Sequence, residues 1–127
     1  MSGNENSTGI VLFAHGSSLE EANRSVEVLA GEVRTTGPYS HVSAAFLELA
    51  RPNLSDALDR ALKAGLKRVI IIPYFLTLGV HLQQDLPRLV AEERRRHPNL
   101  EITVAKSLQG HPLMASIILE RVRTAIP

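Results

Sequence analysis

The sequence predicts a three-layer α/β domain built on a four-stranded parallel sheet, with helices on both faces. Short, largely apolar runs recur four times along the chain, and the first is continuous, as expected of a parallel strand that is buried on both faces. Amphipathic stretches with helical spacing separate these runs. The connecting loops are short. Parallel strands must be joined by crossover connections, here helices, and these crossovers are right-handed. The doubly wound pattern then favours the strand order 2-1-3-4.

We expect strands over residues 9–14, 41–47, 69–72 and 100–105. The first run reads GIVLFA and contains no polar side chain. The third run is a valine followed by three isoleucines, and β-branched residues favour strands because they pack well on a pleated surface.

Start and stop signals bound the four helices. Ser18 and Glu21 have the spacing of a capping box, and Pro52-Asn53 introduces the second helix, which Gly65 closes. The third helix stops at His97 because a proline follows, and the last begins near Pro112. The residues expected to face the sheet are Ala22, Val26, Leu29, Ala30 and Val33; Leu54, Ala57, Leu58, Ala61 and Leu62; Leu82, Leu86, Leu89 and Val90; and Met114, Ile117, Ile118 and Val122.

Length and composition restrict the classes of protein to consider. The chain has 127 residues, which suits one domain over residues 9–127 after a polar, disordered tail over 1–8. A net charge of +1 gives no basis for nucleic-acid binding, and no apolar run is long enough to span a membrane. The absence of cysteine excludes disulfides and thiolate metal sites. The tail has no features of a signal peptide, so we expect a cytoplasmic protein.

The residues that could bind a metal ion or take part in catalysis lie at one edge of the predicted sheet. Ligands of doubly wound folds bind beyond the carboxyl ends of the strands, at the switch point between the first and third strands. The loops after those strands deliver His15 and His81, while Glu48 ends the second strand and His111 follows the fourth. Imidazole with carboxylate suits first-row divalent metal ions. The sequence therefore predicts a metal-handling site at this edge.

Structural roles compete with this interpretation. His15 alone is equally consistent with a core or capping residue, and His81 with a surface residue at a helix start. Glu48 could form an ion pair with Arg51, and His111 could cap the last helix. At the end of the third helix we expect His97 to complement the helix dipole and the three arginines before it to lie on a solvated face.

Four stretches resemble the small, single-domain form of the sirohydrochlorin chelatases, which insert metal into a tetrapyrrole without ATP. They are Val11-Leu12-Phe13-Ala14-His15-Gly16-Ser17 with Asn23; Phe46-Leu47-Glu48 leading to Pro52; Pro73-Tyr74-Phe75-Leu76 through Gly79-Val80-His81 to Asp85-Leu86-Pro87; and Gly110-His111-Pro112. They occur in family order over nearly the whole chain. The chain also lacks a GxxxxGK[ST] phosphate loop.

The resemblance implies a set of roles. His15 and His81 are the catalytic pair and the metal ligands, with Glu48 as a further catalytic group in the cleft. Ser17, Arg51, Gly79 and His111 are implied contacts to the substrate. Ser18 departs from the arginine that many relatives have after His-Gly-Ser, which removes one contact to a substrate carboxylate.

The resemblance also implies the substrates and the assembly. Sirohydrochlorin and a divalent metal are the substrates, with cobalt favoured and iron or nickel as alternatives, and no cofactor is tightly bound. Because relatives of double length contain two such domains, we expect a homodimer that holds the macrocycle in a cleft. A metal-binding carrier or sensor module without chelatase activity is the competing hypothesis.

Overall fold

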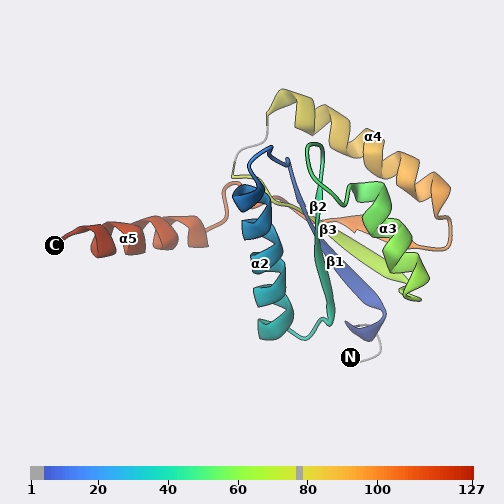
Figure 1. The fold of residues 1–127 in the computed structure, drawn as a ribbon, viewed down its shortest axis with the longest axis horizontal. Coiled ribbons are helices and arrows are strands. Elements are labelled where there is room, and N and C mark those ends of the chain that lie inside the picture. Colours follow the sequence, from blue (N-terminus) through green and yellow to red (C-terminus); the bar gives the residue numbers. More distant parts are fainter. Residues whose placement is uncertain (1–4, 77–78) are drawn as a thin grey trace.

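The fold is an α/β domain around one four-stranded sheet (Figure 1). The computed structural model describes residues 5–76 and 79–127. All strand pairs are parallel and the order is β2-β1-β3-β4, so the predicted order is confirmed. The strands are β1 (Thr8–Ala14), β2 (His41–Phe46), β3 (Arg68–Pro73) and β4 (Glu101–Val104), each within one residue of the expected bounds.

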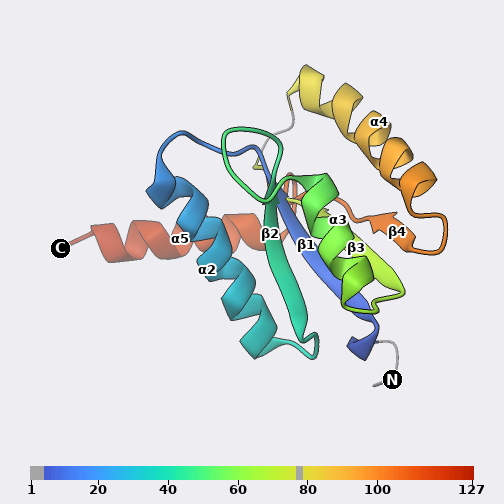
Figure 2. The same ribbon diagram turned by 45° about the vertical axis from the view of Figure 1, so that its right-hand side comes forward.

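The named helices lie where the sequence patterns predict them, and three of them cover the sheet. They are α2 (Glu20–Thr36), α3 (Leu54–Lys63), α4 (Val80–Arg96) and α5 (Leu113–Ala125). Helix α2 lies on one side of the sheet and α3 and α4 lie on the other (Figure 2). None of the helices in the described part of the chain has the length and apolar character of a bilayer span.

The sheet carries a hydrophobic core on each face because side chains alternate along a strand. On the α3 and α4 face, Phe13 and Ile71 pack with Leu58 and are fully buried. On the α2 face, Phe46 packs with Val26. The two cores hold the central strands rigid, so the loops at their carboxyl ends start from fixed positions.

Capping differs from the expectation at one helix and agrees at another. Helix α2 has Leu19 at its N-cap, without a side-chain hydrogen bond, so the capping box predicted from Ser18 and Glu21 is wrong. Helix α3 has a capping box instead: Asp56 N donates to Asn53 Oδ1 at 2.8 Å, and Asn53 N donates to the Asp56 carboxylate at 3.3 Å.

Replacing Asn53 should therefore weaken the domain measurably. Asn53→Ala removes the acceptor for a backbone N–H at the helix start, and we expect a loss of about 1 kcal/mol in the free energy of unfolding. Urea unfolding followed by circular dichroism measures this loss. Asn53→Ser is the matched control, since serine caps nearly as well, and equal losses in both variants would contradict the capping role.

The prediction of a disordered tail over residues 1–8 is wrong for the last residues of that segment. Thr8 belongs to β1 and is 3% exposed. The Ser7 carbonyl accepts hydrogen bonds from Lys67 N at 2.8 Å and Arg68 N at 3.2 Å. These backbone hydrogen bonds hold Ser7 beside the start of β3. The polar side chains of this segment therefore do not indicate a disordered tail. Residues 1–4 lie outside the described part.

The three arginines near the end of α4 are exposed, as predicted, and two of them also have structural partners. Arg94 donates to the Ile102 carbonyl at 2.8 Å and so connects α4 to β4. Arg96 donates to Glu93 at 2.7 Å and to Asp59 at 3.2 Å. The run therefore joins α4 to the strand below it and to α3.

His97 is buried rather than exposed at the helix end. It is 7% exposed, and its Nε2 lies 3.1 Å from Asp59 Oδ1 and 3.7 Å from Glu93 Oε1. Within the described residues, this buried Nε2 makes no hydrogen bond. Its role is to pack α4 on α3, away from the predicted site.

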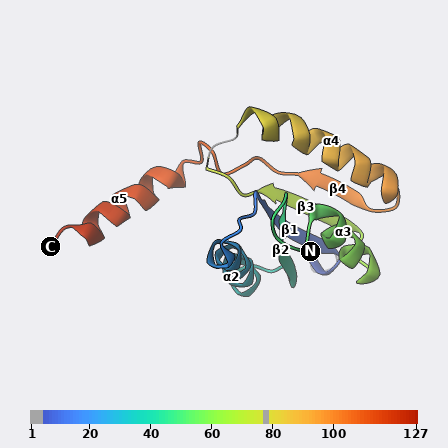
Figure 3. The ribbon, with the colours of Figure 1, turned by 45° about the horizontal axis from the view of Figure 1, so that its top comes forward.

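Helix α5 departs most from the sequence-based prediction. We expected it to bury Met114, Ile117, Ile118 and Val122 against the sheet, but it projects away from the domain (Figure 3). None of its residues is buried. Helical spacing predicts which residues form an apolar stripe, and it carries no information about which surface covers that stripe.

Candidate functional site

The loops after β1 and β2 are joined by backbone hydrogen bonds beyond the ends of the strands. Leu47 N donates to the Ala14 carbonyl at 2.9 Å, and Glu48 N donates to the His15 carbonyl at 3.1 Å. Backbone hydrogen bonds between the two chains therefore extend past the last strand pair, Ala14 with Phe46. This continuation fixes the backbones of His15 and Glu48 relative to each other.

His15 and Glu48, two of the residues predicted at the sheet edge, lie in contact. His15 Nε2 lies 3.3 Å from Glu48 Oε1, and the two side chains are 53% and 58% exposed. A buried, structural role for His15 is therefore wrong. The alternative ion pair of Glu48 with Arg51 is wrong as well, because Arg51 lies 3.7 Å from the Asp56 carboxylate instead.

Gly16 allows the close approach of these two loops. Its φ of +94° lies in the left-handed region that glycine adopts without strain. A Cβ atom built at this position would lie 1.8 Å from the Glu48 carbonyl oxygen. No other residue fits here without pushing the His15 and Glu48 loops apart.

Asn23 anchors the same loop to α2. Ser17 N donates to Asn23 Oδ1 at 2.9 Å, and Asn23 Nδ2 donates to the Ser17 carbonyl at 2.8 Å. The Ser17 hydroxyl accepts a hydrogen bond from Leu19 N at 3.0 Å. The Asn23 side chain thus satisfies the donor and the acceptor of one loop residue, two positions after His15.

The two Asn23 hydrogen bonds can be separated by substitution. Asn23→Ala removes both bonds, and we expect a loss of about 2 kcal/mol in the free energy of unfolding, since each net bond contributes roughly 1 kcal/mol. Asn23→Asp keeps the acceptor for Ser17 N and loses the donor. The melting temperature should be highest for the wild type, lower for Asn23→Asp and lowest for Asn23→Ala. An unchanged melting temperature in Asn23→Ala would refute the anchoring role.

His81 is the second residue of α4, and Gly79 is the N-cap of that helix in an extended conformation. The position predicted for His81 at a helix start is therefore confirmed. Its side chain lies outside the described residues, so its pairing with His15 stays a prediction. Tyr74 N donates to the Phe13 carbonyl at 2.8 Å, which holds the chain after β3 beside the end of β1.

His111 is exposed and caps the last helix, as the structural interpretation anticipates. Leu113 N donates to His111 Nδ1 at 3.0 Å. This contact uses the δ nitrogen and leaves Nε2 for another partner. His111 follows β4, at the same edge of the sheet as the other predicted residues.

Two adjoining cavities open at this edge. One of about 430 Å³ is lined by Glu48, Arg51 and their loop neighbours. The other, of about 390 Å³, is mostly polar and brings together the predicted substrate contacts Ser17 and Arg51, with Arg24 on its wall. Within the described residues, no three histidine, aspartate or glutamate side chains converge into a closed metal site.

Comparison with known proteins gives the family. The CbiX family model matches residues 9–125. The chain belongs to the CbiX family. A CbiX protein of known structure from Marinobacter aquaeolei VT8, described as a cobalamin (vitamin B12) biosynthesis protein, has the same fold: its TM-score is 0.84 at 28% identity, over 94% of this chain and 97% of that one.

Curated relatives of this CbiX chain include proteins of similar length and of double length. The sirohydrochlorin cobaltochelatase of Methanopyrus kandleri is 28% identical over 92% of this chain and 96% of its own length. The chloroplastic sirohydrochlorin ferrochelatase of Arabidopsis thaliana is 30% identical over 91% of this chain, which spans 51% of that protein.

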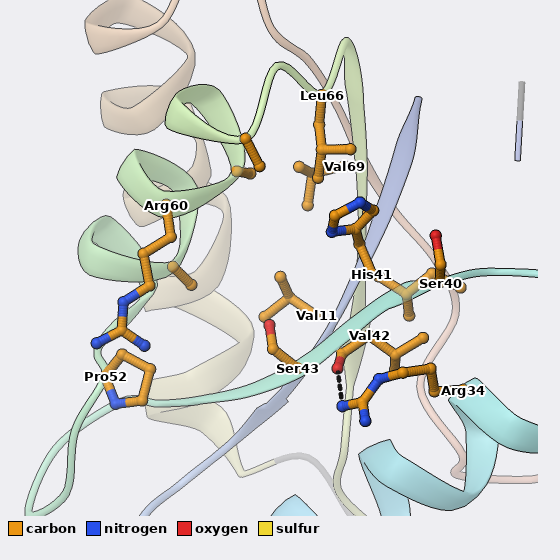
Figure 4. A pocket seen from close by; sticks show the side chains of 15 residues that line it. Val11, Arg34, Ser40, His41, Val42, Ser43, Pro52, Arg60, Leu66 and Val69 are labelled. Atoms are coloured by element: carbon orange, nitrogen blue, oxygen red, sulfur yellow. Dashed lines mark hydrogen bonds between the residues drawn. The ribbon is translucent and has the colours of Figure 1, made fainter. Parts of the chain in front are cut away.

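A third cavity of the CbiX chain lies away from the predicted site. It measures about 370 Å³ and opens at the amino ends of the strands, between β2 and α3, where Arg34, His41 and Arg60 line it (Figure 4). Arg34 is already engaged, because its guanidinium donates to the Val42 carbonyl at 2.8 Å. This cavity contains none of the residues predicted to act on substrate.

One feature of the site was not predicted. Leu49 has a φ of +66°, is well exposed and lines both cavities at the sheet edge. Left-handed backbone at a leucine is strained, and such strain concentrates at functional sites. Nothing in the composition of the segment around Glu48 indicates a positive φ at leucine, so sequence reasoning had no signal for it.

Proposed function

We propose that this CbiX chain inserts a divalent metal ion, cobalt by preference, into sirohydrochlorin without ATP. The observation that carries the proposal is the 3.3 Å contact of His15 with Glu48 at the exposed switch-point edge. The cobaltochelatase name of the Methanopyrus relative, which this chain matches along nearly its full length, supports it. Iron and nickel are the alternative metals, and the Arabidopsis relative is named a ferrochelatase.

The reaction needs groups that hold the metal and groups that remove protons. Two pyrrole N–H protons leave the ring as the metal enters, and a neutral imidazole can act as ligand or as proton acceptor. We assign both tasks to His15 and His81. Glu48 lies close enough to His15 to orient its ring and to take on a proton. Two imidazoles leave coordination positions of the metal open for the ring nitrogens.

Positive and donor groups at the same edge would hold the carboxylates of the macrocycle. Arg51 is 86% exposed at the rim, and Ser17 shares a cavity with it. Gly79 begins α4, and backbone N–H groups at a helix start bind anions readily. We keep His111 as a fourth contact through its Nε2. Leu49 adds an exposed apolar side chain that suits a flat ring.

We further propose a cytoplasmic homodimer whose substrates are sirohydrochlorin and the metal ion, with no tightly bound cofactor. The double length of the Arabidopsis relative supports two units of this size working together. The open cavities of one copy would then face those of a second across a cleft that receives the ring.

The test is spectroscopic. Purified protein is mixed anaerobically with sirohydrochlorin and Co²⁺, and the absorption of the ring is followed against a protein-free control. We expect the metal-containing spectrum to develop faster with protein. Equal rates with and without protein, together with Co²⁺ binding, would instead support a metal carrier. Competition among Co²⁺, Fe²⁺ and Ni²⁺ in the same assay then ranks the metals.

A further inference from the structure

The cavity between β2 and α3 is a space that the hydrophobic core leaves unfilled (Figure 4). Successive side chains of a strand point to opposite faces of the sheet, and Ala45 of β2 belongs to the core on the α3 face. Ser43, two residues earlier, therefore points to the same face. It is exposed and lines the cavity, so a polar group occupies a position where a covered strand would carry an apolar one.

Helix α3 keeps this space open because it presents small side chains to it. Apart from Arg60, the residues on this side of the cavity are Ala57, Ala61 and Ala64. An alanine side chain ends at its β-carbon and cannot reach across to the edge strand. Protein interiors normally fill such spaces closely, so the cavity follows from the residues that α3 carries.

The two ends of the cavity differ in chemistry. Leu66 and Val69 lie at one end and are buried (Figure 4). At the other end the Arg60 guanidinium points toward Pro52, which comes just before Asn53, the N-cap of α3. The charged end therefore lies toward the start of α3, where the helix dipole favours negative charge.

The charge of the cavity is positive and has no acidic counterpart. Arg34 and Arg60 line it, and among the described residues no aspartate or glutamate does so. Arg34 donates to the Val42 carbonyl. Within residues 5–76 and 79–127, the Arg60 guanidinium has no ion pair or hydrogen bond. A guanidinium matches the planar geometry of a carboxylate, and the Ser43 hydroxyl is a further donor.

A strand from another protein does not suit this edge of the sheet. Open sheet edges can recruit an added strand, and β2 is an outer strand. However, the Arg34 guanidinium occupies the Val42 carbonyl at 2.8 Å, and Phe46 N donates to the Pro52 carbonyl at 2.8 Å. The backbone of β2 is therefore engaged near both ends, which favours a small molecule as the occupant.

We propose that this cavity binds a small organic anion, namely a monocarboxylate with a compact apolar body. Its carboxylate pairs with Arg60 and accepts a hydrogen bond from Ser43 Oγ, while its apolar body lies toward Leu66 and Val69. The cavity opens at the amino ends of the strands, whereas His15 follows the carboxyl end of β1. The site is therefore separate from the proposed metal-insertion site, and the inference does not depend on that activity.

Benzoate is a suitable probe because it joins one carboxylate to a compact apolar ring. It is titrated into the full nitrogen-15-labelled chain, and the amide shifts are followed by NMR. We expect saturable shifts over residues 41–43 and 57–64. Benzamide keeps the ring without the charge, and acetate keeps the charge without the ring. Each should bind about tenfold more weakly than benzoate, because one loses the charged contact and the other the apolar contact.

Two variants test the two sides of the cavity. Arg60→Gln should weaken benzoate binding about tenfold, since it removes the charged partner. Lys63→Gln is the matched control, because Lys63 is exposed on the same helix but does not line the cavity, and its loss should leave the affinity unchanged. Ser43→Leu places a large side chain in the space from the β2 side and should abolish the shifts.

The spectrum of each variant without benzoate shows whether the protein stays folded. Shifts that lie only outside the cavity would overturn the proposal. So would benzamide that binds as tightly as benzoate, or equal affinities in the Arg60 and Lys63 variants. None of these outcomes bears on metal insertion, so failure of this site leaves the proposed chelatase activity standing.

Discussion

His15→Ala should abolish metal insertion while the protein stays folded. The imidazole is exposed and contributes nothing to either core, so its loss should leave the free energy of unfolding almost unchanged. A positioned acid–base group contributes roughly 10²- to 10⁴-fold to a rate, and we expect a decrease in that range. The initial rate of Co²⁺ insertion into sirohydrochlorin measures it.

His41→Ala is the matched control for His15→Ala. His41 is also exposed, but it opens β2 at the opposite end of the sheet, so its removal should leave the rate unchanged. His81→Ala should lose activity as His15→Ala does. Full activity in either the His15 or the His81 variant would refute the assignment of the catalytic pair.

Gly16→Ala should damage both the fold and the activity. The new methyl group would meet the Glu48 carbonyl oxygen, and alanine is strained at a φ of +94°. We expect a loss of about 3 kcal/mol in the free energy of unfolding. Because displacement of a reacting group by about 1 Å can cost 10²-fold in rate, insertion should fall by at least about that factor.

Gly31→Ala controls for a methyl group added to glycine in general. Gly31 lies within α2, and a Cβ there meets nothing within 4 Å. Alanine favours the helix over glycine, so we expect a gain of about 0.5–1 kcal/mol and unchanged activity. Comparison of the denaturant midpoints and insertion rates of the Gly16→Ala and Gly31→Ala proteins separates the effect of the steric clash from the effect of an added methyl group. A stable and active Gly16→Ala protein would show that the loops tolerate separation.

The layered sheet could be predicted because buried parallel strands and amphipathic helices leave strong local patterns. Runs such as 9–14 and 69–72 fixed the strands to within one residue, and the short crossovers left few topologies. From the topology alone, His15 and Glu48 could be expected at one edge. Their contact confirms that expectation.

Features that depend on tertiary geometry could not be predicted in this way. Ser18 and Glu21 have the spacing of a capping box, yet the Ser17–Asn23 contacts set the start of α2 one residue later. The role of Gly16 depends on the approach of another loop, and the burial of His97 depends on Asp59 of α3. The direction of α5 is set by the turn at His111, which its apolar spacing does not encode.

The number of rings metallated by each copy of the protein tests the proposed function most directly. Limiting protein is incubated anaerobically with excess Co²⁺ and sirohydrochlorin, and cobalt-containing product is counted after subtraction of the protein-free reaction. Our account predicts many product molecules per subunit in the wild type and almost none with His15→Ala. A plateau at one product per subunit or fewer in the wild type would contradict it, since a catalyst turns over repeatedly.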